Sequence, residues 1–210
     1  MKIKILFTTT ILISLFVSCS TLKKTTNSAT YDEGVVINGV RWATRNVDEP
    51  GKFAKKPESA GKFYQWNRKK AWNTTDNIVA NWDDTNPEGI IWEKSNDPSP
   101  TGWRVPTFTE IKSLCDTEKV SNEWTTQNGV KGRKFTDKTS GNSIFLPAVG
   151  MRNIGNGKLY DVGSEGLYWI SNQHKKGLFT YDILHFRSNF RAYWDSSFSS
   201  CGHSVRPVAE

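Results

Sequence analysis

The second half of the chain consists of short apolar segments that turn-forming residues separate at regular spacing. Asp, Asn, Ser and Gly fill the joints, as in DKTSGN at 137–142. Such segments satisfy their backbone groups by pairing with one another, so they predict antiparallel strands with short connections. The expected strands lie at 130–136, 143–149, 167–171, 178–186, 190–194 and 204–208. An earlier hairpin is expected at 35–42, around an Asn-Gly turn.

One helix precedes these strands. Thr107 and Glu110 have the spacing of a capping box, and Phe108, Ile111 and Leu114 fall on one helical face. This pattern predicts a helix over 108–116. A helix followed by regularly spaced strands predicts an α+β fold with one or two helices, rather than a β-α-β fold.

Aromatic side chains supply much of the expected core. The chain has nine Trp, eleven Phe and six Tyr, and each can bury about 150–250 Å². Trp72, Trp82 and Trp92 lie in or beside the polar stretch 73–100. We expect this stretch to be a long irregular loop that the Trp side chains hold onto the core.

The first eighteen residues have the pattern of a secretory signal. Lys2 and Lys4 precede an apolar run at 5–17 that is too short to cross a bilayer core of about 30 Å. The run ends in LFVSC, which resembles the bacterial lipobox. We therefore expect a signal peptide at 1–18 and acylation of Cys19, with palmitate among the acyl chains. In the alternative, a plain signal peptide is cleaved elsewhere and Cys19 is incidental.

The segment after the cysteine, 19–33, is rich in Ser, Thr and Lys and is expected to be a flexible tether. The expected location is the bacterial cell envelope, with the protein anchored by lipid in the outer membrane. Some surface lipoproteins have an acidic export tag directly after this cysteine. The residues STLKK at 20–24 contain no acidic side chain, so surface exposure is not predicted.

The charge pattern argues against a nucleic-acid partner. Removal of Lys2 and Lys4 with the signal leaves 26 basic and 21 acidic residues, a net charge of +5. The basic clusters are scattered and interleaved with acidic residues. They do not form the continuous stripe that binding to a phosphate backbone needs.

Six segments, in order, resemble the Fibrobacter succinogenes major paralogous domain, which is common in lipoproteins of gut Bacteroidetes. They are 38–47 (NGVRWATRNV), 64–67 (YQWN), 102–107 (GWRVPT) with Glu110, 145–150 (FLPAVG), 168–171 (YWIS) and 204–208 (SVRPV). The resemblance covers 34–210. It implies a C-type lectin-like fold in which the chain ends pair and a ligand face lies opposite. A fold by itself does not imply a function.

No catalytic, metal or cofactor motif is present, so we expect a protein that is not an enzyme. His174, His185 and His203 lack the spacing of metal ligands. The calcium-binding triplets of lectins, Glu-Pro-Asn and Trp-Asn-Asp, do not occur. Cys115 and Cys201 would suit a disulfide in an oxidising compartment, but two separate thiols explain them equally well.

The region 171–201 is the candidate ligand-binding region, because it mixes aromatic, Arg, Asn and Ser side chains as adaptable recognition surfaces do. We expect Phe179, Ile183 and Phe186 to be buried and 187–195 to be partly displayed. The alternative is that half of the region alternates into the core. The candidate ligand-binding residues are Asn172, His174, Arg187, Asn189, Arg191, Tyr193, Trp194 and Asp195.

Three functions follow in order of preference. The first is a lipid-anchored, non-enzymatic protein that presents a binding face to a protein or glycan. Diversity-generating retroelements rewrite a C-terminal window in some similar domains, and the same could hold here. The second is a structural or accessory subunit of a surface assembly such as a pilus. The third is a degenerate enzyme.

Overall fold

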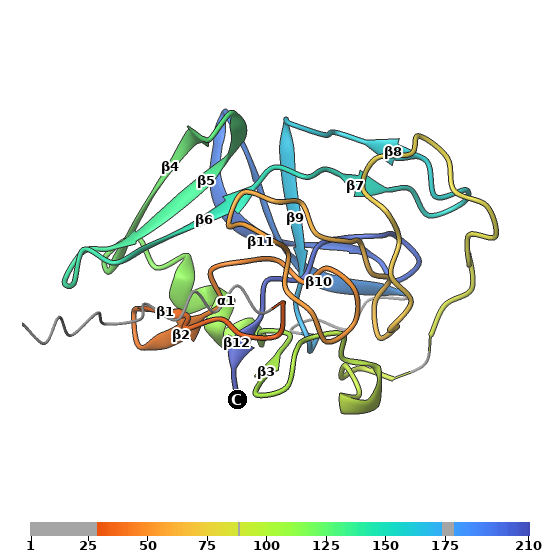
Figure 1. Cartoon of the computed structure of the whole chain (residues 1–210), viewed down its shortest axis with the longest axis horizontal. Coiled ribbons are helices and arrows are strands. Elements are labelled where there is room, and N and C mark those ends of the chain that lie inside the picture. The colour runs from red at the N-terminus through yellow and green to blue at the C-terminus, as the bar shows by residue number, and fades with distance from the viewer. Residues whose placement is uncertain (1–28, 88, 174–178) are drawn as a thin grey trace, which may run out of the picture.

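The computed structural model describes residues 29–87, 89–173 and 179–210. In these residues, one seven-residue α helix and one short 3-10 helix accompany twelve strands, which form four small sheets (Figure 1). The predicted α+β class is therefore wrong, and the fold is β-rich. The reason is that, within the described ranges, only the capped segment at 108–114 forms an α helix.

Segments from the two ends of the domain meet in one sheet. Its strand order is β1 (Val35–Ile37), β2 (Val40–Trp42), β12 (Val208–Ala209) and β3 (Trp103–Arg104). Asn38 and Gly39 have φ values of 46° and 81°, as a tight hairpin turn requires. The predicted hairpin at 35–42 is therefore confirmed.

The remaining strands form three antiparallel sheets. One sheet contains β4 (Val120–Gln127), β5 (Val130–Asp137) and β6 (Ser143–Pro147), and its β5–β6 pairing confirms the predicted hairpin. A second contains β11 (Phe190–Phe198), β10 (Thr180–Arg187) and β9 (Glu165–Trp169) in that order. The third pairs β7 (Met151–Arg152) with β8 (Leu159–Tyr160).

The helix α1 (Phe108–Leu114) begins with the predicted capping box. The Thr107 hydroxyl accepts from the Glu110 N–H at 3.4 Å, and the Glu110 carboxylate accepts from the Thr107 N–H at 2.7 Å. Ile111 and Leu114 are buried. The helix is thus fixed at its first turn and by its inner face, which leaves its outer face available to solvent.

The β9–β10–β11 sheet separates two hydrophobic clusters, because successive residues of a strand point to opposite faces. Leu184 and Phe186 pack with α1 in one cluster, and Ile183 packs with Trp66 and Trp169 in the other. The loop after 72 is held as predicted. Trp72 and Trp92, at the two ends of this stretch, are buried, and the Trp82 Nε1–H donates to the Ile154 carbonyl at 2.9 Å. The 3-10 helix η1 (Lys94–Asn96) lies in the same loop.

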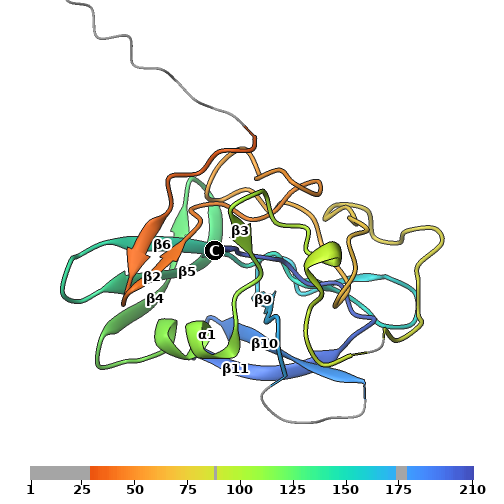
Figure 2. The same cartoon turned by 90° about the horizontal axis from the view of Figure 1, so that it is seen from below.

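No helix in the described part of the chain is long and apolar enough to cross a membrane. The described chain starts on the side of the domain opposite β10 and β11 (Figure 2).

Candidate binding surface

Six of the eight predicted binding residues lie together on the hairpin of β10 and β11. Arg187 ends β10, Asn189 is in the turn, and the other four are on β11, the outer strand of its sheet. Arg187 and Tyr193 are half-buried. The exposed members are Asn189, Arg191, Trp194 and Asp195.

The other two predicted residues are not brought to this hairpin. The Asn172 Oδ1 accepts the Phe108 N–H at 2.8 Å, so this side chain satisfies a free amide at the start of α1. His174 lies outside the described residues. Ile183 and Phe186 are buried as expected, but Phe179 is 47% exposed, so that expectation is wrong. Its φ of 59° interrupts the strand alternation just before β10 begins.

One face of the sheet has a polar cluster around His185. Its Nε2 lies 2.7 Å from a Glu165 carboxylate oxygen, and its Nδ1 lies 2.9 Å from the Tyr193 hydroxyl and 3.5 Å from Asp195. His185 can donate from Nε2 to Glu165 and accept the Tyr193 hydroxyl at Nδ1, which gives each of these side chains a hydrogen-bond partner. Burial, together with Asp195, raises the pKa of Tyr193. The Tyr193 phenol is therefore protonated at neutral pH and is not an activated nucleophile.

A Ser–His pair lies nearby on the same face. The Ser197 hydroxyl is 2.7 Å from His203 Nε2. Burial, with a smaller effect of His185, lowers the pKa of His203 to about 3. Its Nδ1 has no partner among the described residues, whereas catalytic histidines are oriented through that atom. His203 is therefore too weak a base to activate Ser197 at neutral pH.

The two thiols Cys115 and Cys201 are both free, so the disulfide alternative is not realised. Cys115 lies at the end of α1 and Cys201 in the segment after β11. Burial raises the pKa of Cys115 to about 12 and also raises that of Cys201. Neither thiol is a thiolate at neutral pH. Across residues 29–87, 89–173 and 179–210, no group of three or more His, Cys, Asp and Glu side chains is arranged so that it could hold a metal ion.

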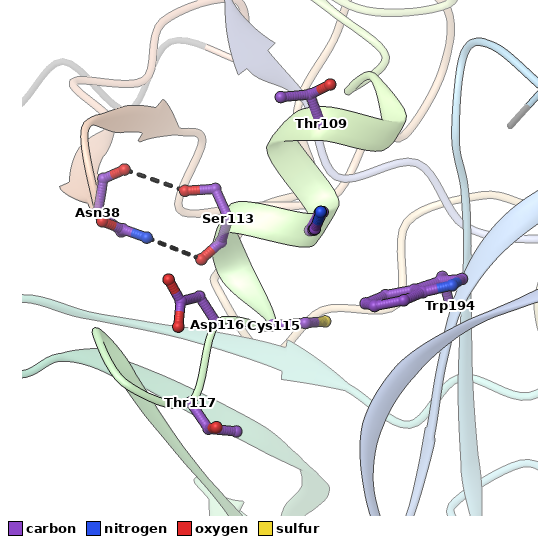
Figure 3. Close-up of a pocket in the computed structure, with 8 residues that line it drawn as sticks. Asn38, Thr109, Ser113, Cys115, Asp116, Thr117 and Trp194 are labelled. Atoms are coloured by element: carbon purple, nitrogen blue, oxygen red, sulfur yellow. Dashed lines mark hydrogen bonds between the residues drawn. The ribbon is translucent and has the colours of Figure 1, made fainter.

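Trp194 is on the opposite face of the sheet from the His185 cluster, because it follows Tyr193 directly on β11. There it borders a hollow of about 570 Å³ between β11, α1 and the β1–β2 turn (Figure 3). Figure 3 shows Trp194 and the Cys115 sulfur directed toward each other across this space. We call it the α1–β11 hollow. Its lining residues are Asn38, Thr109, Lys112, Ser113, Cys115, Asp116, Thr117 and Trp194.

The walls of the α1–β11 hollow are fixed by hydrogen bonds and packing. The Asn38 Nδ2–H donates to the Ser113 carbonyl at 3.0 Å, and the Ser113 hydroxyl donates to the Asn38 carbonyl at 3.1 Å (Figure 3). Phe108 packs edge-to-face with Trp194, with ring centroids 5.6 Å apart. The hollow is therefore formed before any ligand binds, which lowers the entropic cost of binding.

A second hollow, of about 580 Å³, lies beside Trp103 and Arg104. Four of its five charged side chains already have partners, and Lys69 has none among the described residues. Arg104 binds Glu110 through both terminal nitrogens, and Lys94 Nζ is 3.1 Å from a Glu210 carboxylate oxygen. This hollow offers a ligand fewer free charges than the α1–β11 hollow does.

The sequence identified Trp194 but not the residues that share its hollow. Lys112 and Asp116 are four residues apart on the predicted helix, which signals only a solvated helix face. Asn38 comes from the other end of the domain. Glu165 was likewise missed, because only the pairing of β9 with β10 brings it to His185.

Fold and site together define a β-rich protein with a preformed hollow beside an outer strand. Comparison with family models, with curated proteins and with solved structures gives no match for this chain. The resemblance to the Fibrobacter succinogenes major paralogous domain therefore stays a prediction.

Proposed function

We propose that this protein is a lipid-anchored, non-enzymatic binding protein of the bacterial cell envelope and that its ligand binds in the α1–β11 hollow. The observation that carries the proposal is the combination of a 43% exposed Trp194 with a hollow whose walls are already fixed. Large exposed aromatic side chains in concave, preformed sites are typical of ligand-binding surfaces.

The position of the hollow suits an anchored protein. The described chain starts on the side of the domain opposite β10 and β11, and α1 lies with these strands (Figure 2). A tether from a lipid on Cys19 would therefore reach the domain on the side away from the hollow.

The absence of an activated nucleophile in the described residues supports a binding role over catalysis. His203 is a weak base, Tyr193 is a protonated phenol, and both thiols have raised pKa values. The nucleophile of an enzyme needs an adjacent base or a lowered pKa.

The outer edge of β11 favours binding through side chains over assembly by strand addition, the mode of many surface fibres. A register shift after His185 interrupts its pairing with β10. The Asp195 carboxylate accepts the Ser196 N–H at 2.8 Å, which occupies one backbone donor. Bulges and charged residues of this kind protect sheet edges from pairing.

Photo-crosslinking in intact cells tests the binding site. Thr109→benzoylphenylalanine places the crosslinker in the hollow, and Tyr160→benzoylphenylalanine places it at an exposed aromatic position on β8. We expect a discrete adduct from position 109 and none from position 160. Equal labelling at both positions, or none at either, would contradict the proposal.

The anchor has its own test. Cys19→Ser should abolish incorporation of an alkyne-labelled palmitate and release the protein from the membrane fraction. Cys115→Ser is the matched control and should leave both unchanged. Retention of the label by Cys19→Ser would show that the lipid is attached elsewhere, and a wild-type protein without label would show that it has no such lipid.

A further inference from the structure

We infer that the α1–β11 hollow binds a neutral sugar ring, as part of an oligosaccharide, with the ring stacked on Trp194. This inference rests on the proposed function and names the ligand class for the same site. Three properties of the hollow lead to it: its aromatic wall, its unused polar groups and its balanced charge.

The aromatic wall is the exposed part of the Trp194 ring. An aromatic face is electron-rich and apolar. The C–H groups on one side of a pyranose ring form a flat, weakly positive, apolar surface of similar size, so the two surfaces match. Phe108 packs against one side of the indole, with the two ring centroids 5.6 Å apart. The Trp194 side chain therefore has few orientations to lose when a ligand binds, which lowers the entropic cost of binding.

The rim has hydrogen-bonding groups that the protein leaves free. Lys112 forms no ion pair or hydrogen bond with any residue in the described ranges, and Asp116 uses only one carboxylate oxygen, which accepts from the Glu118 N–H at 3.0 Å. Thr109 and Thr117, each of which has a hydroxyl, line the same hollow. Donors and acceptors are therefore both available, as sugar hydroxyls require, since each hydroxyl donates one bond and accepts others.

The charge and size of the hollow argue against other ligand classes. Lys112 and Asp116 have opposite charges, so the site has no net preference for an anion. A folded protein partner would need about 800 Å² on each side, which exceeds one small hollow with a single aromatic wall. A neutral sugar ring with several hydroxyls agrees with both the balanced charge and the small size of the hollow.

The test uses the full-length protein in detergent micelles and an array of immobilised neutral oligosaccharides. We expect saturable binding to a subset of the array. Trp194→Ala should weaken this binding at least tenfold, or about 1.4 kcal/mol, and Trp194→Phe should weaken it less. Asp116→Asn should weaken it several-fold. Tyr160→Ala removes an aromatic side chain of matching exposure, 42%, outside the hollow and should have no effect.

Binding to no oligosaccharide, or equal binding by wild type and Trp194→Ala, would overturn the inference. Periodate separates this failure from failure of the proposed function, because it destroys vicinal diols and leaves most proteins able to bind. If the crosslinked adduct from position 109 forms equally well in cells that were treated with periodate, the hollow binds a ligand that is not a sugar. In that case the proposed function stands and the sugar inference is wrong.

Discussion

Arg206 Nε donates to Asn46 Oδ1 at 2.9 Å across 160 residues of sequence, and both side chains are buried. Arg206 also donates to the Ala43 carbonyl at 3.2 Å, and Asn46 donates to the Ala60 carbonyl at 2.9 Å. Burial lowers the pKa of Arg206 to about 10, so it is still charged at neutral pH. The hydrogen bonds of the Arg206 guanidinium therefore link segments near the beginning and the end of the domain.

Asn46→Ala should therefore be strongly destabilising, because it leaves a buried charge short of an acceptor. We expect the free energy of unfolding to fall by about 2–3 kcal/mol, measured by chemical denaturation. The double variant Asn46→Ala/Arg206→Met should lose less than the sum of the two single losses, since it removes the unpaired charge. Arg41→Ala, at an exposed position, is the control. Simple additivity would refute the coupling.

Stability should depend on pH through His203. The pKa of this group is about 3 in the folded state and about 6.5 in the unfolded chain. Between these values the unfolded state binds a proton that the folded state does not, so stability is lost as pH falls below about 6.5. The contribution is up to about 1.4 kcal/mol per pH unit. Denaturation curves of His203→Gln between pH 7 and 4 should show a shallower dependence than wild type. Parallel curves would contradict this prediction.

Gly166 is required by close packing and not by its backbone conformation. A Cβ atom at this position would lie 2.1 Å from the Phe186 ring, in the cluster behind β9. Gly166→Ala should lower the free energy of unfolding by about 1–3 kcal/mol, measured by thermal or chemical denaturation. Gly155→Ala, whose Cβ would meet only the Asn153 side chain at 3.9 Å, should be close to neutral. Partial rescue of Gly166→Ala by Phe186→Leu would identify the ring as the cause, and no rescue would exclude it.

Arg133 is a positioning residue for the β10–β11 hairpin. It is buried on β5, and its Nη2 donates to the carbonyls of Arg187 and Phe190, the residues that flank the turn. Arg133→Met should raise amide hydrogen exchange at the turn and at the start of β11, because these carbonyls lose their donor. Lys131→Met, at an exposed position on the same strand, should leave exchange unchanged. Unaltered protection from hydrogen exchange in Arg133→Met would show that the hairpin is stable without the Arg133 hydrogen bonds.

Local signals predicted local structure well. The capping box of Thr107 and Glu110, the Asn38–Gly39 turn and the β5–β6 hairpin all depend on residues that are neighbours in sequence. The fold class was wrong because a helix of seven residues cannot form a layer of its own. Strand β4 was missed because only a few of its side chains, such as Trp124, pack against the core.

The candidate site could be predicted only in part for the same reason. The residue types at 187–195 predicted that this segment would be partly exposed, but the alternation of side chains along β11 divides them between the two faces of the sheet. The α1–β11 hollow combines a turn near residue 38, a helix near 112 and a strand near 194. No single-sequence pattern relates positions so far apart, whereas the folded chain brings them within one small space.

Molecules tied to a membrane by lipid share a thin layer and meet sideways far more often than molecules free in solution. An unprotected strand at the rim of a sheet would, under such crowding, join neighbours into ribbons and bury Trp194 between copies. The register shift in β11 and the Ser196 amide held by Asp195 work against that outcome. In the anchored protein that we propose, they would let many copies lie side by side while the hollow of each copy stays open.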